Sequence, residues 1–376
     1  MDQTSKHLNG GLCEAARVMR GTPLMAAAAV LVGGALFSDA SPSDPLAAEI
    51  ERWSAFLRDD RSTDDFAKQV KEGATSGMAR IEQALKDDRR WLALLRMSSV
   101  ANDAEALRYL KERSPAERTD VAAFESEWKR VGGVLASDLG RPVPDAYDGV
   151  RPAVVRAIGE AALPQAGVFY HASVEYGRST TPDSGLYYLG AALGQRDFGS
   201  FVRRLSSPSR LVPPRVRSVA GELEALQDDL LAAYRPPASV ERHREFIVAN
   251  STLKEARELQ AAGLDHGALL RYLQAAVRVA PLRKDAPAPD GTLADKLKAF
   301  EPRLAHGGVD HTIGRLLLEW GQADLAEHAA DGKASIAAAV AADALPRYFA
   351  ALEPGRPRAA VPAPTVAVTL VRWPYT

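Results

Sequence analysis

The stretch VRSVAGELEALQDDLLAAY, residues 216–234, decides the expected fold class. Apolar side chains recur along it at spacings of three and four residues, at Val216, Val219, Leu223, Leu226, Leu230 and Tyr234. Because an α-helix turns once in about 3.6 residues, this spacing places all of them on one helical face. Pro213 and Pro214 precede the stripe and Pro236 and Pro237 follow it, so we expect one helix between these prolines.

Similar stripes recur along most of the chain. Residues 46–57 carry one, and Asp44 with Pro45 before it has the character of a helix start, because Asp caps free N–H groups and Pro suits the first turn. Short motifs predict three further helix ends. Ser62 with Asp65 forms a capping box at the start of one helix. Gly132 with Gly133 is the predicted stop of a helix carrying Phe124, Trp128 and Val131, and Thr292 with Asp295 is the predicted start of a helix carrying Leu293, Leu297, Phe300 and Leu304.

Three segments are predicted to be helical hairpins with a tight turn at glycine. Residues 193–198 read LGQRDF, residues 320–325 read WGQADL, and residues 262–265 read AGLD. Glycine can end one helix in the left-handed conformation, and Asp can cap the next. The turn resembles that inside tetratricopeptide-type helical repeats, and this resemblance implies a solenoid with a concave face. Any two packed antiparallel helices can use the same turn, so a bundle and an irregular solenoid both stay open.

The expected fold is therefore all-α, built of stacked antiparallel helical hairpins, with one short C-terminal β-strand. Alternation typical of a strand is confined to residues 365–373, TVAVTLVRW, which follow a proline-rich tether. This strand can pair with a second segment, pair with another copy of the chain, or stay unpaired. The predicted parts of the chain are a signal peptide or membrane anchor in 1–40, an N-terminal helical region in 41–140, a helical-hairpin region in 141–353, and the tether with its strand-like tail in 354–376.

Residues 24–37, LMAAAAVLVGGALF, carry no charge and follow Arg17 and Arg20. A basic stretch, then a short apolar run, then small residues is the order of a secretory signal peptide. A helix of this length spans about 21 Å, which is shorter than the roughly 30 Å of hydrocarbon in a bilayer. We therefore expect an extracytoplasmic protein, periplasmic or secreted, with an uncleaved anchor in the inner membrane and a buried Ala-rich helix as the alternatives.

Composition excludes several kinds of function. Lys and Arg number 47 against 48 Asp and Glu, and this balance argues against a dedicated nucleic-acid binder. The single cysteine, Cys13, cannot form an intramolecular disulfide or a Cys-based metal site. The sequence contains no phosphate-binding glycine loop, no nucleophile elbow and no His-Glu-x-x-His string, so we expect no cofactor and lean against an enzyme.

Aromatic and charged side chains are concentrated between residues 169 and 204. Tyr and Arg are typical anchors of binding interfaces, although Tyr at helical spacing also serves as core. The residues predicted to bind a ligand by stacking and hydrogen bonding are Tyr170, His171, Tyr176, Arg178, Tyr187 and Tyr188.

Three functions remain open. The leading one is an exported or membrane-tethered helical scaffold that binds a protein or a cell-envelope component without catalysis. An exported helical enzyme acting on glycan or peptide is the first alternative, because its carboxylates could come from distant helices. Metal or small-ligand binding through the loop His306–His311, with Asp310, is the second. In all three, we expect only the N-terminal segment to contact a membrane. The sequence does not fix the oligomeric state.

Overall fold

The protein is seen here in a computed structural model that describes residues 44–61, 64–139, 152–178, 182–205, 211–235, 240–283, 292–305, 308–329 and 336–352. Across these ranges the chain forms α-helices, two short 3-10 helices and two isolated β-bridges, with no β-strand. The expected all-α fold is confirmed. The predicted signal or anchor in 1–40 and the predicted strand in 365–373 lie outside the described residues.

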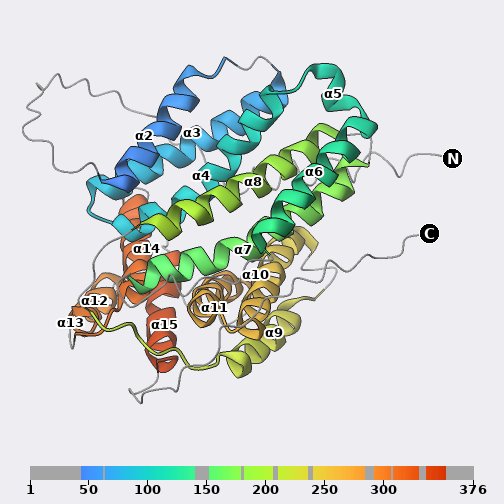
Figure 1. The fold of residues 1–376 in the computed structure, drawn as a ribbon. Helices are drawn as coiled ribbons and strands as arrows, with labels where there is room; N and C mark the ends of the chain where they lie inside the picture. Colours follow the sequence, from blue (N-terminus) through green and yellow to red (C-terminus); the bar gives the residue numbers. More distant parts are fainter. Residues whose placement is uncertain are drawn as a thin grey trace, which may run out of the picture.

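The helices are α2 (Pro45–Asp59), α3 (Asp65–Lys86), α4 (Arg90–Lys111), α5 (Pro115–Thr119), α6 (Val121–Leu139), α7 (Ala153–Gly177), α8 (Pro182–Arg204), α9 (Ala220–Ala233), η1 (Val240–Arg242), α10 (His243–Ala261), α11 (Asp265–Val279), η2 (Ala280–Leu282), α12 (Leu293–Lys298), α13 (Glu301–Ala305), α14 (Thr312–Ala329) and α15 (Ile336–Ala350). In Figure 1, α2, α3 and α4 lie on one side, α7 and α8 cross the middle, and α9 to α15 lie on the other side. None of these helices is both long enough and apolar enough to cross a bilayer.

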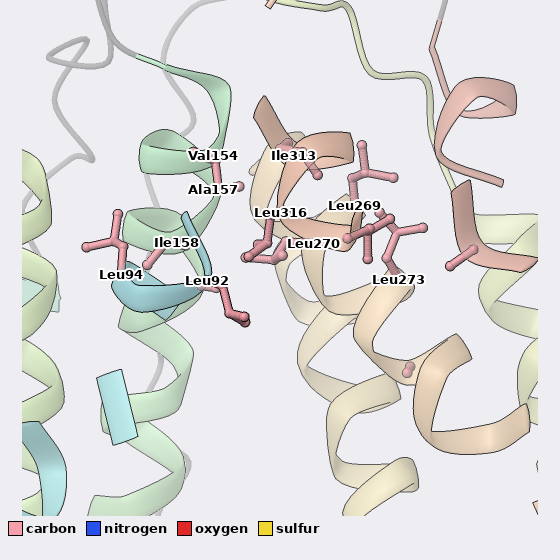
Figure 2. Close-up of a cluster of buried hydrophobic side chains, with 14 of the residues drawn as sticks. Leu92, Leu94, Val154, Ala157, Ile158, Leu269, Leu270, Leu273, Ile313 and Leu316 are labelled. Atoms are coloured by element: carbon pink, nitrogen blue, oxygen red, sulfur yellow. The ribbon is translucent and has the colours of Figure 1, made fainter. Parts of the chain in front are cut away.

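One large core joins the two sides of the molecule. Figure 2 shows Leu92 of α4, Val154 and Ile158 of α7, Leu269 of α11 and Ile313 of α14 within one cluster of buried side chains. Helices before residue 140 and helices after it therefore contribute to the same core. The division of the chain at that residue stays a prediction.

The expected start of the first helix is confirmed. The Asp44 side chain accepts a hydrogen bond from the N–H of Leu46 at 3.1 Å, and Pro45 occupies the first turn. Ser62, the first residue of the predicted capping box, lies outside the described residues. Helix α3 begins at Asp65 and its N-cap is Asp64, whose carboxylate accepts from the N–H of Ala67 at 2.8 Å.

Two of the three predicted glycine turns are wrong, because α8 and α14 continue through Gly194 and Gly321. Both glycines mark places where helices approach closely. A Cβ added at Gly194 would lie 2.8 Å from the carbonyl oxygen of Ala101 in α4, and one at Gly321 would lie 2.9 Å from the Cβ of Ala341 in α15. The helices can touch there because glycine has no side chain.

The third predicted turn, between α10 and α11, is confirmed. Gly263 has a φ of 72°, in the left-handed region that glycine adopts without steric cost. Asp265 does not cap α11 as expected; Leu264 is the N-cap and has no capping side chain, while the Asp265 carboxylate accepts from the Gln260 amide at 3.0 Å.

Other predicted helix ends also differ. Helix α6 runs through Gly132 and Gly133 to Leu139, because Gly132 serves close packing: a Cβ there would lie 2.2 Å from the Tyr170 hydroxyl. Helix α9 begins at Ala220, after an extended segment in which Val216 forms an antiparallel bridge with Leu352.

The helix predicted to start at Thr292 is split. Thr292 holds the N-cap position of α12 but makes no capping hydrogen bond with its side chain. Helix α12 ends at Lys298, and the separate short helix α13, with the buried Leu304, follows it.

Three long helices receive their N-terminal caps from residues far away in the sequence. The N-caps Arg89, Pro152 and Leu264 of α4, α7 and α11 make no capping hydrogen bond with their side chains. The N–H of Leu92 instead donates to Glu319 at 2.8 Å, that of Ala153 to Asp310 at 2.6 Å, and that of Gly267 to Glu160 at 2.6 Å. A carboxylate at this position satisfies free N–H groups and interacts favourably with the helix dipole.

Candidate functional site

The candidate site lies where α7 ends and α8 begins. These two helices form a tight antiparallel pair through the middle of the molecule (Figure 1). Their ends meet at Gly177 and Gly185, where a Cβ added to Gly185 would lie 2.4 Å from the Cα of Gly177. The absence of side chains at these two positions brings aromatic residues of both helices together.

Four aromatic side chains form the site, and we call them the aromatic surface: Phe169 and Tyr176 of α7 with Tyr187 and Tyr188 of α8. All four are half-buried, so each keeps part of its ring in solvent. The rings of Tyr176 and Tyr188 stack at a centroid distance of 5.0 Å. Tyr187 meets Tyr188 edge-on at 5.4 Å, and Phe169 lies 6.3 Å from Tyr188. Tyr188 is therefore the centre of the surface.

The aromatic surface is fixed to neighbouring helices. The Tyr187 hydroxyl donates to the carboxylate of Asp103 in α4 at 2.6 Å. Its ring meets Phe66 of α3 edge-on at 5.9 Å. These contacts hold the Tyr187 ring in one orientation before any ligand arrives.

Tyr170, also predicted to bind a ligand, lies in the core instead of on the aromatic surface. Its side chain is 6% exposed, and its ring stacks on Trp128 of α6 at 5.4 Å. Its hydroxyl donates to the carbonyl oxygen of Trp128 at 3.3 Å. Burial raises the pKa of Tyr170 to about 12, so its hydroxyl stays protonated at neutral pH.

His171 and Arg178 are exposed and lie around the same Trp128–Tyr170 stack. The His171 ring meets that of Tyr170 edge-on at 5.5 Å, and burial together with the positive charge of Lys254 lowers its pKa. Arg178 forms an ion pair with Glu125 at 2.5 Å and lies 5.5 Å from the centre of the Trp128 ring. The structure thus brings Tyr176, Tyr187 and Tyr188 together and places the other three predicted residues in a second group.

A charged network beside this group could not be found in the sequence. Glu127 of α6 accepts hydrogen bonds from Tyr109 and Arg113 and from Arg130 at 2.9 Å. Burial opposes the charge on Glu127, but hydrogen bonds from Arg130, Tyr109 and Arg113 outweigh it and lower the pKa to about 2. Arg130 lies three residues after Glu127 on α6, a spacing visible in the sequence. Tyr109 of α4 and Arg113, just after α4, have no local spacing to Glu127. Their bonds fasten α6 to α4.

The loop considered for metal binding is described only in part, since His306 lies outside the described residues. Both carboxylate oxygens of Asp310 accept hydrogen bonds, from Ala153 at 2.6 Å and from the N–H and hydroxyl of Thr312 at 2.9 and 2.7 Å. The Nδ1 atom of His311 is 3.0 Å from the Tyr348 hydroxyl. Within the described part of the chain, no three His, Cys, Asp or Glu side chains converge as metal ligands.

Three buried carboxylates, those of Glu160, Glu255 and Glu319, have raised pKa values. Burial raises the pKa of Glu319 to about 7, and burial likewise raises that of Glu160. Such values are typical of catalytic acids but also of structural groups. Glu160 and Glu319 accept hydrogen bonds from the first turn of another helix, and Glu255 forms an ion pair with Arg271 at 3.0 Å. Each of the three therefore has a structural partner.

The aromatic surface offers stacked, half-buried rings, one of which is held in place by a hydrogen bond to Asp103. It can bind apolar and aromatic groups by contact and polar groups at its edges. Comparison with known proteins gives no further guide, because no protein-family model, no curated protein and no solved structure matches the chain.

Proposed function

We propose that this chain is an exported, non-catalytic helical scaffold that binds another protein through its aromatic surface. The observation that supports this most is the stack of Tyr176 on Tyr188, because both side chains pack against each other and are still only half-buried. Tyr is enriched among the residues that dominate protein–protein binding, since it provides much contact area for few rotatable bonds.

The rigidity of the surface favours the same function. Tyr187 is held by Asp103 at 2.6 Å, and Tyr188 contacts three neighbouring rings. Side chains that are already ordered lose less entropy on binding, so more of the contact energy is available for affinity. A matching partner would present apolar or aromatic side chains to the rings and polar groups to the tyrosine hydroxyls.

The proposed location rests on residues 24–37 and on the arginines before them. Fusion of residues 1–60 to a phosphatase that is active only outside the cytoplasm tests it. The fusion is expected to be active, and Leu31→Arg is expected to abolish the activity, because a charge in the centre of the apolar run costs about 3 kcal/mol in the membrane. An inactive fusion without this substitution would refute export.

The binding surface can be tested in cells with a photo-crosslinking amino acid in place of Tyr188 in the full chain. A discrete protein adduct is expected, and Tyr176→Ala should reduce its yield about tenfold, because truncating an interface aromatic costs roughly 1–2 kcal/mol. Tyr176→Phe keeps the ring and should restore the adduct.

Phe300 is the matched control position, because it is a half-buried aromatic residue at the end of α12. The same crosslinker there should give no such adduct. An adduct whose yield does not depend on Tyr176 would contradict the proposal. An adduct that a muramidase digests and a protease does not would also contradict it, because the partner would then be a cell-envelope glycan.

A further inference from the structure

A second surface, at the tip of the α9–α10 hairpin, carries large apolar side chains in solvent. Leu231 of α9 is 60% exposed, Val240 of η1 is 56% exposed and Ile247 of α10 is 55% exposed. We call these three residues the apolar tip. The two helices meet there through Tyr234, whose ring lies 4.9 Å from that of Phe246 and whose hydroxyl is 3.1 Å from His243 Nδ1.

Helix geometry places Leu231 and Ile247 on one side of the hairpin. Leu230 and Phe246 are buried, and each exposed residue follows its buried neighbour by one position, which turns it by about 100°. Helices α9 and α10 run in opposite directions, since Tyr234 meets Phe246 at one end while Arg257 donates to the carbonyl oxygen of Leu223 near the other. Tyr234, four residues after Leu230, contacts Phe246, so these side chains face each other across the hairpin. A turn of about 100° from each, in helices of opposite direction, therefore carries Leu231 and Ile247 toward the same side.

Acidic residues continue the same face of α9. Glu224 and Asp228 are exposed and precede Leu231 by seven and three residues, which is the spacing of one helical stripe. Helix α9 contains four acidic side chains and no basic one. Read from its N-terminus, this face is first acidic and then apolar.

The carboxyl-terminal segment of the chain starts beside this face. Leu352, the last residue that the structure describes, forms an antiparallel bridge with Val216, and the N–H of Arg217 donates to the carbonyl oxygen of Ala351 at 2.9 Å. Helix α9 begins only four residues after Val216. The last described residue therefore lies near the N-terminal end of α9, and residues 354–376 follow from that point in the sequence.

The composition of this segment matches the face in charge and in order. Residues 354–376 contain three arginines, Arg356, Arg358 and Arg372, and no acidic residue. The first two arginines come early, and the apolar run TVAVTLVRW follows at 365–373. The twelve residues from 353 to 364 can span about 37 Å in an extended proline-rich conformation, whereas Ala220 and Leu231 are about 16 Å apart along the helix.

We propose that residues 354–376 dock along α9, with Arg356 and Arg358 beside Glu224 and Asp228 and with residues 365–373 on the apolar tip. Docking removes apolar side chains of both partners from water, while the exposed ion pairs set the direction of the segment more than they add affinity. The occupant of the apolar tip is thus a segment of the same chain.

Trypsin digestion of the full chain under native conditions tests this, because Arg372 lies within the docked segment. Cleavage after Arg372 is expected to be slow in the parent and about tenfold faster in the double variant Leu231→Asp, Ile247→Asp. A tenfold change corresponds to about 1.4 kcal/mol of docking free energy. The fluorescence of Trp373 is obtained as the difference between the parent and Trp373→Phe. Acrylamide should quench this fluorescence more strongly in the double variant than in the parent.

Val121→Asp is the matched control, because Val121 is a 43% exposed valine on α6, far from α9 in the sequence. It should leave cleavage after Arg372 unchanged, and circular dichroism should show that all variants keep their helices. Equal cleavage rates in the parent and the double variant would overturn the proposal, and so would equal acceleration by Val121→Asp. Protection that depends on protein concentration would also overturn it, since the occupant would then be a second copy.

Discussion

Replacing Glu319 by glutamine is expected to remove a pH dependence of stability between about pH 4.5 and pH 7. The Glu319 side chain is 7% exposed and accepts a hydrogen bond from the N–H of Leu92 at 2.8 Å. Burial raises its pKa from 4.5 to about 7, against the opposing effect of the N–H groups of Leu92 and Trp91. A carboxyl group of this kind is more easily protonated in the folded state than in the unfolded state.

The sign follows from proton binding. Below pH 4.5 both states carry the proton, so Glu319 adds no pH dependence there. Between pH 4.5 and 7 the folded state holds the proton and the unfolded state has lost it, so the free energy of unfolding falls as the pH rises. The full change from 4.5 to about 7 corresponds to about 3 kcal/mol. Above pH 7 the effect is constant.

Urea denaturation at intervals from pH 4 to pH 8 measures this. The glutamine oxygen can still accept from Leu92 but does not titrate, so the stability of Glu319→Gln relative to the parent should rise by up to about 3 kcal/mol between pH 4.5 and pH 7. Glu327→Gln, on an exposed part of the same helix, should show no such trend. A stability difference between Glu319→Gln and the parent that is independent of pH would refute the reasoning.

Four further substitutions test the fold, each by denaturation in urea. Gly194→Ala should lower the free energy of unfolding by about 1–3 kcal/mol, because the added Cβ would lie 2.8 Å from the carbonyl oxygen of Ala101. Gly133→Ala should raise the free energy of unfolding by up to about 1 kcal/mol, because no atom lies within 4 Å of the added Cβ and alanine favours the helix. Asp88→Gly should raise it by about 1 kcal/mol, because Asp88 has a φ of 57°, and an unchanged or lower stability would contradict this. Asp310→Ala should lower it by about 1–2 kcal/mol through loss of the cap on α7, and full stability in this variant would show that the cap is dispensable.

The sequence predicts helices well here because apolar periodicity is a local property. It predicts the role of glycine poorly, since Gly263 and Gly194 stand in similar strings yet one ends a helix and the other lets two helices touch. The difference lies in whether a second helix crosses at that point, which no local string records. The caps from Asp310 and Glu319 escape prediction for the same reason, because their partners are more than a hundred residues away.

The candidate site was partly predictable for a related reason. Tyr170 and Tyr176 both lie on α7, but a separation of six residues turns them about 120° apart around the helix axis. The two side chains therefore point in different directions, and only Tyr176 joins the aromatic surface. Which one stays exposed depends on Trp128 of α6, and the sequence does not reveal that this helix covers Tyr170.

The caps that Glu319 and Asp310 provide to α4 and α7 affect the order in which these helices can form during protein synthesis. Translation delivers α4 and α7 well before Asp310 and Glu319, the residues that accept from their first turns. Until that late stretch has left the ribosome, both helices begin with unsatisfied N–H groups, and their ends remain easily opened. The last helices therefore complete the ends of the earlier ones only after most of the chain has been made.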